Sequence, residues 1–403
     1  MIFFNTNISS LIIIFMSCAG LFALLSAIFG MAPMRRVARY GRKAMLKEQE
    51  LLDIPDSKLP SVTVVVYTRQ AEDYLRNFIE TILKQNYPCF DIVIVNDGST
   101  DMTREIADNL VKEYSNVKYT FVSDTAKNVS RVKVAYTLGI KASDNDVIVT
   151  TAANCLPTST NWLRLLCGPL VSSEIGITVG YSFVPSDQHV DSCRWTRSFD
   201  SAVTASQWLS ASLCDKPFRG DQYNLAFRKK LFFENKGYAS STALSGGHDD
   251  IFINEISRNT HTAVALHPDS NIIMNWEPSQ IRRLYRDECE RRIFISRFLH
   301  TGSFRLQGFN SICIWLALAF SVVSIIISAP NLFPVAVCGG ILLALWGYEI
   351  TLFRRNARIL HKIKLWWSVP FLWLARPFMT ATRRQRVNAE RSKHYTWTVG
   401  MKP

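Results

Sequence analysis

The sequence predicts an α/β domain with a mostly parallel sheet, flanked by membrane-spanning helices. Two observations support this fold class. Between residues 61 and 151, continuous runs of β-branched residues alternate with segments of helical periodicity. Strands that are connected through helices lie parallel, so this alternation predicts a sheet with helices on both faces. Long uncharged apolar stretches lie outside this region, near the N-terminus and after residue 310.

The elements of the α/β region follow in order. Residues 61–67 ("SVTVVVY") have the continuous apolar run of a strand that is buried on both faces. We expect further strands at 91–95, 117–122 and 146–151, separated by helices at 75–83, from about 100 to 114, and at 129–141. After Pro157 the pattern predicts a helix at 159–173, a strand at 175–183, a helix near 195–213, a strand at 223–227 and a helix that begins in "GGHDDIF".

Ligands of such sheets bind beyond the carboxyl ends of the strands. The segments "NDGSTD" (residues 96–101) and "TAANC" (residues 151–155) both follow predicted strands. We therefore expect them to face one crevice. No GxGxxG motif follows the first strand, which argues against a dinucleotide-binding domain.

Three apolar stretches are long enough to cross a membrane. Residues 11–32 form an uncharged run of about 22 residues, enough to cross roughly 30 Å of hydrocarbon as a helix. Residues 311–328 and 332–353 form two more, joined by "APNLFP". A fourth run, 365–379, is shorter and contains Pro370 and Arg376, so we expect an interfacial segment. The first run has neither a basic flank before it nor a cleavage site after it, which disfavours a signal peptide.

The net charge of +13 is concentrated beside these apolar runs. Basic clusters follow the first run, precede the second, follow the third and fill residues 383–393. This placement is typical of the cytoplasmic flanks of membrane spans and argues against a nucleic-acid partner. We expect an outer N-terminus, residues 33–310 inside, a short outer loop and a cytoplasmic C-terminus, in the cytoplasmic (inner) membrane of a bacterium. The nine cysteines and seven histidines show no metal-binding spacing.

These patterns predict the following division of the chain: an N-terminal transmembrane helix at 1–32, a basic linker at 33–60, the α/β domain at 61–281, basic interfacial helices at 282–310, two transmembrane helices at 311–353, and a basic C-terminal region at 354–403 that includes the interfacial segment 365–379.

Four motifs together indicate a family. "SVTVVVY" stands at the opening strand, and "LKQNYPCFDIVIVNDGSTDMT" is close to the pattern LxQxYPxxEIIVVDDGSTDxT. "GHDDIF" and "QIRR" follow at residues 247–252 and 280–283. The chain resembles membrane-anchored bacterial glycosyltransferases of family 2, which have the GT-A fold, over roughly residues 60–300. The resemblance implies an inverting transferase in surface-polysaccharide synthesis, with a nucleotide sugar (UDP-linked) as donor and a lipid-linked or membrane-proximal glycan as acceptor.

The resemblance also implies roles for individual residues. Asp97 would bind the base and ribose of the nucleotide, because a carboxylate accepts hydrogen bonds from an imide and a hydroxyl. Asp249, beside Asp250, would be the general base that takes the proton of the acceptor hydroxyl. Gln280 and Arg283 would bind the acceptor or the diphosphate. Each of these residues also has a purely structural alternative role. Asp97 would form a turn, Asp249 and Asp250 would interact favourably with the helix dipole, and Arg283 would contact lipid headgroups.

One motif of the family is missing. The turn after the fourth strand normally presents Asp-x-Asp to Mg²⁺ or Mn²⁺, and here it is Ala152-Ala153-Asn154. Mg²⁺ requires oxygen ligands, and Asn154 offers one neutral carbonyl, so any metal site would be weak. Arg131 and Lys133 flank the place where the family has a phosphate-binding lysine, and His248 replaces an acid.

Three interpretations remain. An active enzyme works without a metal and uses Arg131, Lys133 or Arg283 to neutralise the leaving group. Alternatively, a weak metal site is built from other acids, such as Asp124 or Asp221. In the third, the chain is a catalytically inactive scaffold that binds a partner glycosyltransferase in a polysaccharide-assembly complex.

Overall fold

The computed structural model describes residues 2–123, 129–185, 193–299, 308–329 and 331–389. The chain divides into two compact units. The larger comprises residues 40–190, 208–301 and 383–403, and the smaller comprises residues 1–39, 191–207 and 302–382. Each unit is described separately below.

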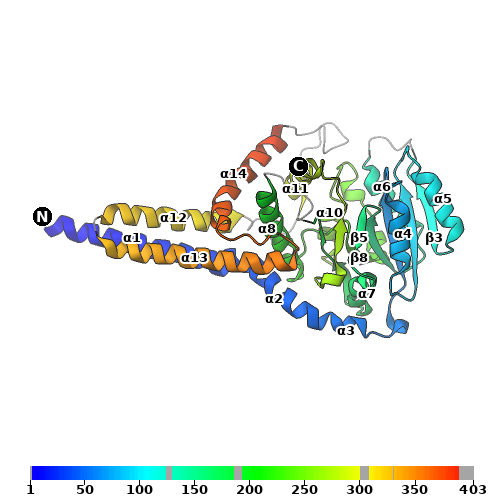
Figure 1. Ribbon diagram of the computed structural model, residues 1–403, viewed down its shortest axis with the longest axis horizontal. Helices are drawn as coiled ribbons and strands as arrows, with labels where there is room; N and C mark the ends of the chain where they lie inside the picture. Colours follow the sequence, from blue (N-terminus) through cyan, green and yellow to red (C-terminus); the bar gives the residue numbers. More distant parts are fainter. Residues whose placement is uncertain (1, 124–128, 186–192, 300–307, 330, 390–403) are drawn as a thin grey trace. The chain divides into compact units, whose positions relative to one another are not determined.

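A seven-stranded sheet forms the centre of the larger unit, with the order β3-β2-β1-β4-β8-β6-β9 (Figure 1). Strands β1 to β4 are mutually parallel, as the alternation of strands and helices predicts, and β8 is antiparallel to both β4 and β6. The fold class is therefore confirmed as α/β with a mostly parallel sheet. The strands are β1 (Val62–Thr68), β2 (Phe90–Asn96), β3 (Val117–Phe121), β4 (Val147–Ala152), β6 (Ile175–Val179), β8 (Leu225–Arg228) and β9 (His261–Val264).

Helices cover both faces of this sheet, because successive residues of a strand point to opposite sides. Val64 of β1 belongs to a core shared with α4 (Leu75–Leu83) and α7 (Trp162–Cys167). Its neighbour Val65 faces α6 (Arg131–Lys141), where a Cβ on Gly139 would lie 2.3 Å from Val65 Cγ1. Only glycine allows α6 to approach the sheet this closely. Helix α5 (Thr103–Glu113) packs beside α4.

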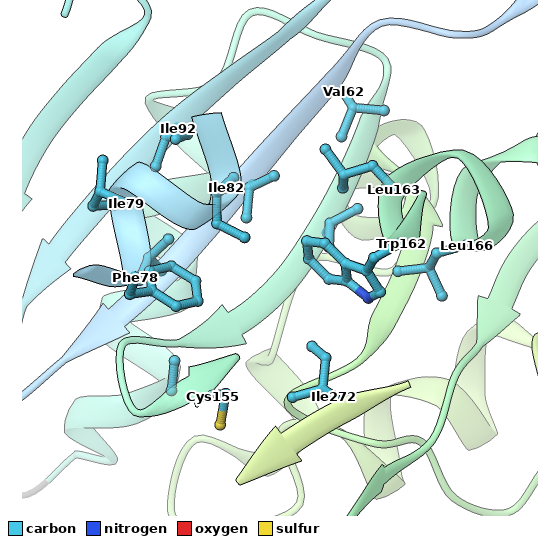
Figure 2. Close-up of a cluster of buried hydrophobic side chains, with 14 of the residues drawn as sticks. Val62, Phe78, Ile79, Ile82, Ile92, Cys155, Trp162, Leu163, Leu166 and Ile272 are labelled. Carbon is cyan, nitrogen blue, oxygen red and sulfur yellow. The ribbon is translucent and has the colours of Figure 1, made fainter. Parts of the chain in front are cut away.

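The main core lies between β1, α4 and α7 (Figure 2). Trp162 is fully buried there, close to Leu163, Leu166 and Ile272 in the figure. Its indole N–H donates to Asn224 Oδ1 at 2.9 Å, which satisfies the one polar group of this side chain. The apolar positions that the sequence pattern assigns to strands and helices are thus the ones that fill this core.

Several predicted elements are shorter than expected. The helix expected at 159–173 consists of α7 followed by a 3₁₀ turn at Gly168–Val171, where Pro169 ends the regular helix. The strand expected at 175–183 is split into β6 and β7 (Ser182–Phe183). With β5 (Cys155–Pro157) and β10 (Ile272–Met274), β7 forms a second, three-stranded sheet that the sequence pattern did not predict.

Further helices of the larger unit lie before β1 or after β8 along the chain. The expected helix after "GGHDDIF" is α10 (Asp250–Ile256), and α11 (Ile281–Ile295) lies in the region expected to form interfacial helices. The larger unit also contains the short helices α3 (Gln49–Leu52) and α9 (Lys229–Glu234).

Among its described residues, the smaller unit contains three helical stretches that are long and apolar enough to cross a membrane. They are Ser9–Gly30, which comprises most of α1 (Ile2–Leu25) and the turn after it, α12 (Phe309–Ser328) and α13 (Leu332–Ile359), and α1, α12 and α13 run side by side in Figure 1. Helix α1 continues through a π turn, Ser26–Gly30, into α2 (Ala32–Lys47). At that turn Ser26 Oγ donates to Asn310 Oδ1 at 2.7 Å. The three apolar runs identified in the sequence are therefore helical.

The fourth apolar run lies in a longer helix than expected, α14 (Ser368–Ala389). One face of this helix is buried at Trp373, and the opposite face exposes Phe371 and Phe378. The buried Arg376 pairs with Asp200 of α8 (Arg194–Ser212) at 3.2 Å. An amphipathic helix with exposed aromatic residues is typical of a membrane interface.

Candidate active site

The ends of three parallel strands bring the two predicted turns together. Asp97 directly follows β2, and its N–H donates to the Thr68 carbonyl of β1 at 2.9 Å. On the other side of β1, Tyr67 is in register with Ala152 of β4, and the Ala153 N–H donates to the Tyr67 carbonyl at 3.1 Å. Both turns therefore lie at one edge of the sheet, and the crevice that we expect them to face stays a prediction.

Two protein groups hold the buried carboxylate of Asp97. The Tyr67 hydroxyl donates to Oδ2 at 2.6 Å, and Arg131 Nε donates to Oδ1 at 2.5 Å. Burial, followed by the hydrogen bond to Asp97, raises the pKa of Tyr67, so this phenol stays protonated as a donor. Arg131 was expected to reach the phosphates. It begins α6 beside the end of β2 and pairs with Asp97 instead.

The side chain of Lys133 also binds groups of the protein itself. Its side chain is almost fully buried, and Nζ donates to the carbonyl oxygens of Ser241 and, at 3.1 Å, of Leu244. Burial lowers the pKa of Lys133 to about 7. This side chain therefore supports the loop that leads to the acidic motif, rather than the phosphate-binding role expected from its place in the sequence.

The acidic motif stands at the start of α10. Gly247 has a φ of 82°, and a Cβ there would lie 2.7 Å from Ile251 Cδ1, so the turn requires glycine. Asp249 is the N-cap residue and Asp250 the first residue of the helix. Both carboxylates are buried. The chain thus places two adjacent acids in a protected position, where their pKa values respond strongly to neighbouring charges.

The two carboxyl groups differ in charge near neutral pH. Burial, together with the negative charge of Asp249, raises the pKa of Asp250 to about 7, although Arg219 Nε lies 3.4 Å from its Oδ1. Burial also acts to raise the pKa of Asp249, but the nearby arginines Arg291 and Arg219, together with His248 when its ring is protonated, outweigh it and lower that pKa. Asp249 is therefore the ionised member of the pair.

A row of aromatic rings joins Asp97 to the acidic motif. Tyr67, whose hydroxyl binds Asp97, lies 6.2 Å from Tyr136 between ring centroids, and Tyr136 stacks on His248 at 5.4 Å. Burial lowers the pKa of His248 to about 4, so its ring is neutral at physiological pH. Two ring contacts thus lead from the expected nucleotide-binding carboxylate to the expected base.

The turn after β4 has no carboxylate. Ala152 and Ala153 are buried, and the backbone carbonyl of Asn154 accepts from the Asn275 N–H at 2.9 Å. Of the two acids considered as substitute metal ligands, Asp221 accepts hydrogen bonds from the Ser182 N–H and hydroxyl, each at 2.7 Å, and Asp124 lies outside the described residues. Within the described ranges no group of three or more His, Cys, Asp or Glu side chains has the arrangement of a metal site.

Gln280 and Arg283 lie on the surface. Gln280 is the N-cap residue of α11, and Arg283 pairs with Asp287 one turn later at 3.7 Å, with 78% of its side chain exposed. These positions suit contact with an external group, such as a lipid headgroup or an acceptor, better than a protected diphosphate site.

Comparison with known proteins identifies the fold and the family. Residues 61–228, which contain β1 to β8 with Asp97 and the β4 turn, match the model of the family "Glycosyl transferase family 2". The chain carries a family 2 glycosyltransferase domain. The motifs that suggested this family in the sequence lie within the matched residues or follow them along the chain.

The domain is similar to several bacterial proteins over part of its length. It is 30% identical over 91 residues to a teichoic acid poly(glycerol phosphate) polymerase of Staphylococcus epidermidis, and 30% identical over 135 residues to the glycosyltransferase GlyA of Streptococcus pneumoniae serotype 4. These alignments cover 21% and 31% of this chain, and 13% and 18% of the relatives.

Among solved structures, the mannosyltransferase PcManGT from Pyrobaculum calidifontis, in complex with GDP-Man and Mn²⁺, has a similar fold. Its TM-score is 0.51 at 16% identity, and the alignment covers 90% of this chain and 99% of that one.

Three residues of the candidate site were not expected from the sequence. Tyr136 lies on an ordinary helical face, and its ring contacts appear only when α6 is placed on the sheet. Arg219 is isolated in the sequence, and Arg291 belongs to a run of arginines that were interpreted as contacts to lipid headgroups. The structure places both arginines close enough to influence the pKa of Asp249.

Proposed function

We propose that this chain transfers a sugar from a nucleotide sugar, expected to be UDP-linked, to a lipid-linked or membrane-proximal glycan acceptor with inversion, in the synthesis of a cell-surface polysaccharide. One observation carries the proposal: Asp97 and Asp249 stand at the two ends of one packed aromatic row within a family 2 glycosyltransferase domain. The names of the relatives, among them a teichoic acid polymerase, support a surface polymer as the product.

The proposed reaction uses the two ends of this row. Asp97 binds the base and ribose with the lone pairs that Tyr67 and Arg131 leave open. The acceptor hydroxyl oxygen attacks the anomeric carbon from the face opposite the diphosphate, and a new C–O bond forms. The bond between this carbon and the β-phosphate oxygen breaks, and its electron pair leaves with UDP. Asp249, the ionised member of the acidic pair, takes the hydroxyl proton.

The membrane part of the proposal follows from α1, α12 and α13. We propose that these helices span the cytoplasmic membrane, that the α/β domain is cytoplasmic, and that α14 lies in the interface. The domain division expected from the sequence is retained, with the glycosyltransferase domain at 61–281. A membrane-anchored domain of this kind meets acceptors that are carried on lipids.

A scaffold function is the second candidate, and the β4 turn favours it, because neither Ala152 nor Asn154 supplies the carboxylate that a metal requires. Turnover decides between the two. Purified protein in detergent is incubated with UDP-sugars, and release of UDP is measured with and without lipid-linked acceptors.

We expect Asp249→Asn to reduce UDP release on the order of 10²- to 10⁴-fold, since an amide cannot accept the proton. Asp108→Asn, an exposed substitution on α5, is the matched control. If the wild-type protein binds UDP but turns over no nucleotide sugar, the scaffold function is correct.

A further inference from the structure

The side chains at the end of β4 do not fit the divalent cation that the family implies. Mg²⁺ and Mn²⁺ are held by carboxylate oxygens, and this edge offers two buried alanines and one amide. The oxygens of the nearby Asp221 are occupied by Ser182 and by the Tyr223 N–H. A departing nucleoside diphosphate nevertheless needs positive charge beside it. That charge must come from other side chains.

Most cations around the site are already engaged. Arg131 binds Asp97, Lys133 binds two backbone carbonyls, and Arg283 pairs with Asp287 at the surface. Arg219 and Arg292 both pair with Glu288 across α11, and Arg219 also faces Asp250.

Arg291 differs from all of these. It is half-buried, and within the described part of the chain it makes neither a hydrogen bond nor an ion pair. Its aliphatic stem packs on the turn before the acidic motif, where a Cβ on Gly246 would lie 2.8 Å from Arg291 Cδ. Its charge lowers the pKa of His248 and contributes to lowering that of Asp249. The guanidinium is therefore held in place by packing and has its donors available.

A second donor without a partner among the described residues lies in the same turn, two residues after the Gly246 on which Arg291 packs. His248 is only 5% exposed, and among the described residues neither ring nitrogen has a hydrogen-bond partner. A neutral imidazole always carries one N–H. Leaving a buried donor unsatisfied costs on the order of 1–3 kcal/mol, so an orphan donor in a protected position points to a ligand that completes it.

We propose that Arg291 and His248 form an anion site that binds the diphosphate of the nucleotide without a metal ion. The inference rests on the proposed function, because the aromatic row from Tyr67 to His248 connects this site with Asp97, the expected nucleotide-binding carboxylate. The arginine fork donates two parallel hydrogen bonds to phosphate oxygens, and the imidazole N–H donates a third. As the anomeric C–O bond breaks, these donors stabilise the charge that develops on UDP, and no proton is transferred to it.

Binding of inorganic pyrophosphate tests the site without relying on catalysis or on Asp97. Isothermal titration of the full-length protein in detergent is performed in the presence of EDTA. We expect the wild-type protein to bind pyrophosphate, Arg291→Ala to weaken binding about 10- to 100-fold, and Arg291→Lys to have an intermediate effect because the charge remains without the fork. Arg282→Ala, an exposed position on the same helix, is the control.

Nucleotides separate this inference from the proposed function. Arg291→Ala should weaken UDP binding and leave UMP binding within about twofold, since UMP has no β-phosphate. His248→Phe keeps the stacked ring and removes the donor, and should weaken both UDP and pyrophosphate about 3- to 10-fold. Equal affinity of wild type and Arg291→Ala for pyrophosphate overturns the inference, as does a wild-type affinity that appears only with added Mg²⁺. Absence of UMP and UDP binding alongside intact pyrophosphate binding contradicts the proposed nucleotide site instead.

Discussion

Substitution of Asp97 by asparagine tests the nucleotide site most directly. The carboxylate accepts hydrogen bonds at 2.6 Å and 2.5 Å from Tyr67 and Arg131, and each oxygen keeps a lone pair for a ligand. Asparagine has nearly the same shape but replaces one acceptor oxygen with an NH₂ donor. That group then faces either the Tyr67 hydroxyl or the Arg131 Nε–H, and only one acceptor remains for the ligand.

The expected magnitude follows from this geometry. A hydrogen bond to a charged group contributes about 1.5–3 kcal/mol, so loss of one contact to the base or ribose should raise the Kd for UDP about 10- to 150-fold. The variant should also be less stable by about 2 kcal/mol, because Arg131 loses its charged partner but keeps 26% of its side chain in water. Isothermal titration with UDP measures the first effect, and thermal melting shows whether the variant is folded.

Asp91→Asn is the matched control. Asp91 lies at the opposite end of the same strand, where it pairs with Lys118 at 3.7 Å and is partly exposed. The Asp91→Asn variant should bind UDP with the same Kd as the wild-type protein. If folded Asp97→Asn binds UDP within twofold of the wild type, the carboxylate does not contact the nucleotide and the site is wrongly placed.

Three further outcomes are expected. Changing Ala152 and Asn154 together to Asp should create Mn²⁺-stimulated donor hydrolysis, measured as UDP release, and no stimulation in a folded, UDP-binding variant would refute it. The raised pKa of Asp250, about 7, means that the folded protein holds a proton that the unfolded chain releases near pH 4. The free energy of unfolding should therefore fall as the pH rises from about 4 to 7, and Asp250→Asn should reduce this dependence on pH, measured by thermal melting. If the variant shows the same dependence on pH as the wild-type protein, Asp250 does not hold the proton. Cysteine at exposed Leu332 should react with an impermeant maleimide in intact cells and cysteine at Leu46 should not, in a background without the exposed native cysteines; the reverse pattern would invert the proposed topology.

The parallel half of the sheet was predictable because its strands are buried on both faces. Continuous runs such as residues 61–67 have few other interpretations, and the helices between them fix the parallel direction. Strands of two or three residues, such as β7 and β10, carry too few side chains to show a period, and they exist because they pair with one another. The start of α5 is another local feature that the sequence pattern did not predict, because Asp101 accepts there from the Thr103 N–H.

The position of a site residue was predictable from the sequence where it directly follows a strand. The contacts of long side chains were not predictable, because they depend on which groups the tertiary structure places within reach. Asp97 follows β2, so its position depends on the backbone alone. Arg131 and Lys133 were expected to bind phosphate from their spacing, yet both bind protein groups, because α6 starts beside Asp97 and passes under the loop before the acidic motif. Arg291 was one arginine in a basic run, and only the packing of α11 near Gly246 separates it from its neighbours.

The loss of the metal-binding aspartates and the position of Arg291 form one electrostatic arrangement. Aspartates at positions 152 and 154 would favour binding of a diphosphate only with a bound cation between the carboxylates and the phosphates. Without that cation, the negative carboxylates would repel the negative diphosphate. The uncharged turn at Ala152 and Asn154 lacks this repulsion. His248 stands where the family has an acid, and its neutral imidazole removes a second negative charge from the neighbourhood of Asp249. The guanidinium of Arg291, held by its packing on the turn at Gly246, then supplies the charge. Loss of a metal site alone would not require Arg291 and His248, which have no partner among the described residues, at the turn that leads into the ionised Asp249.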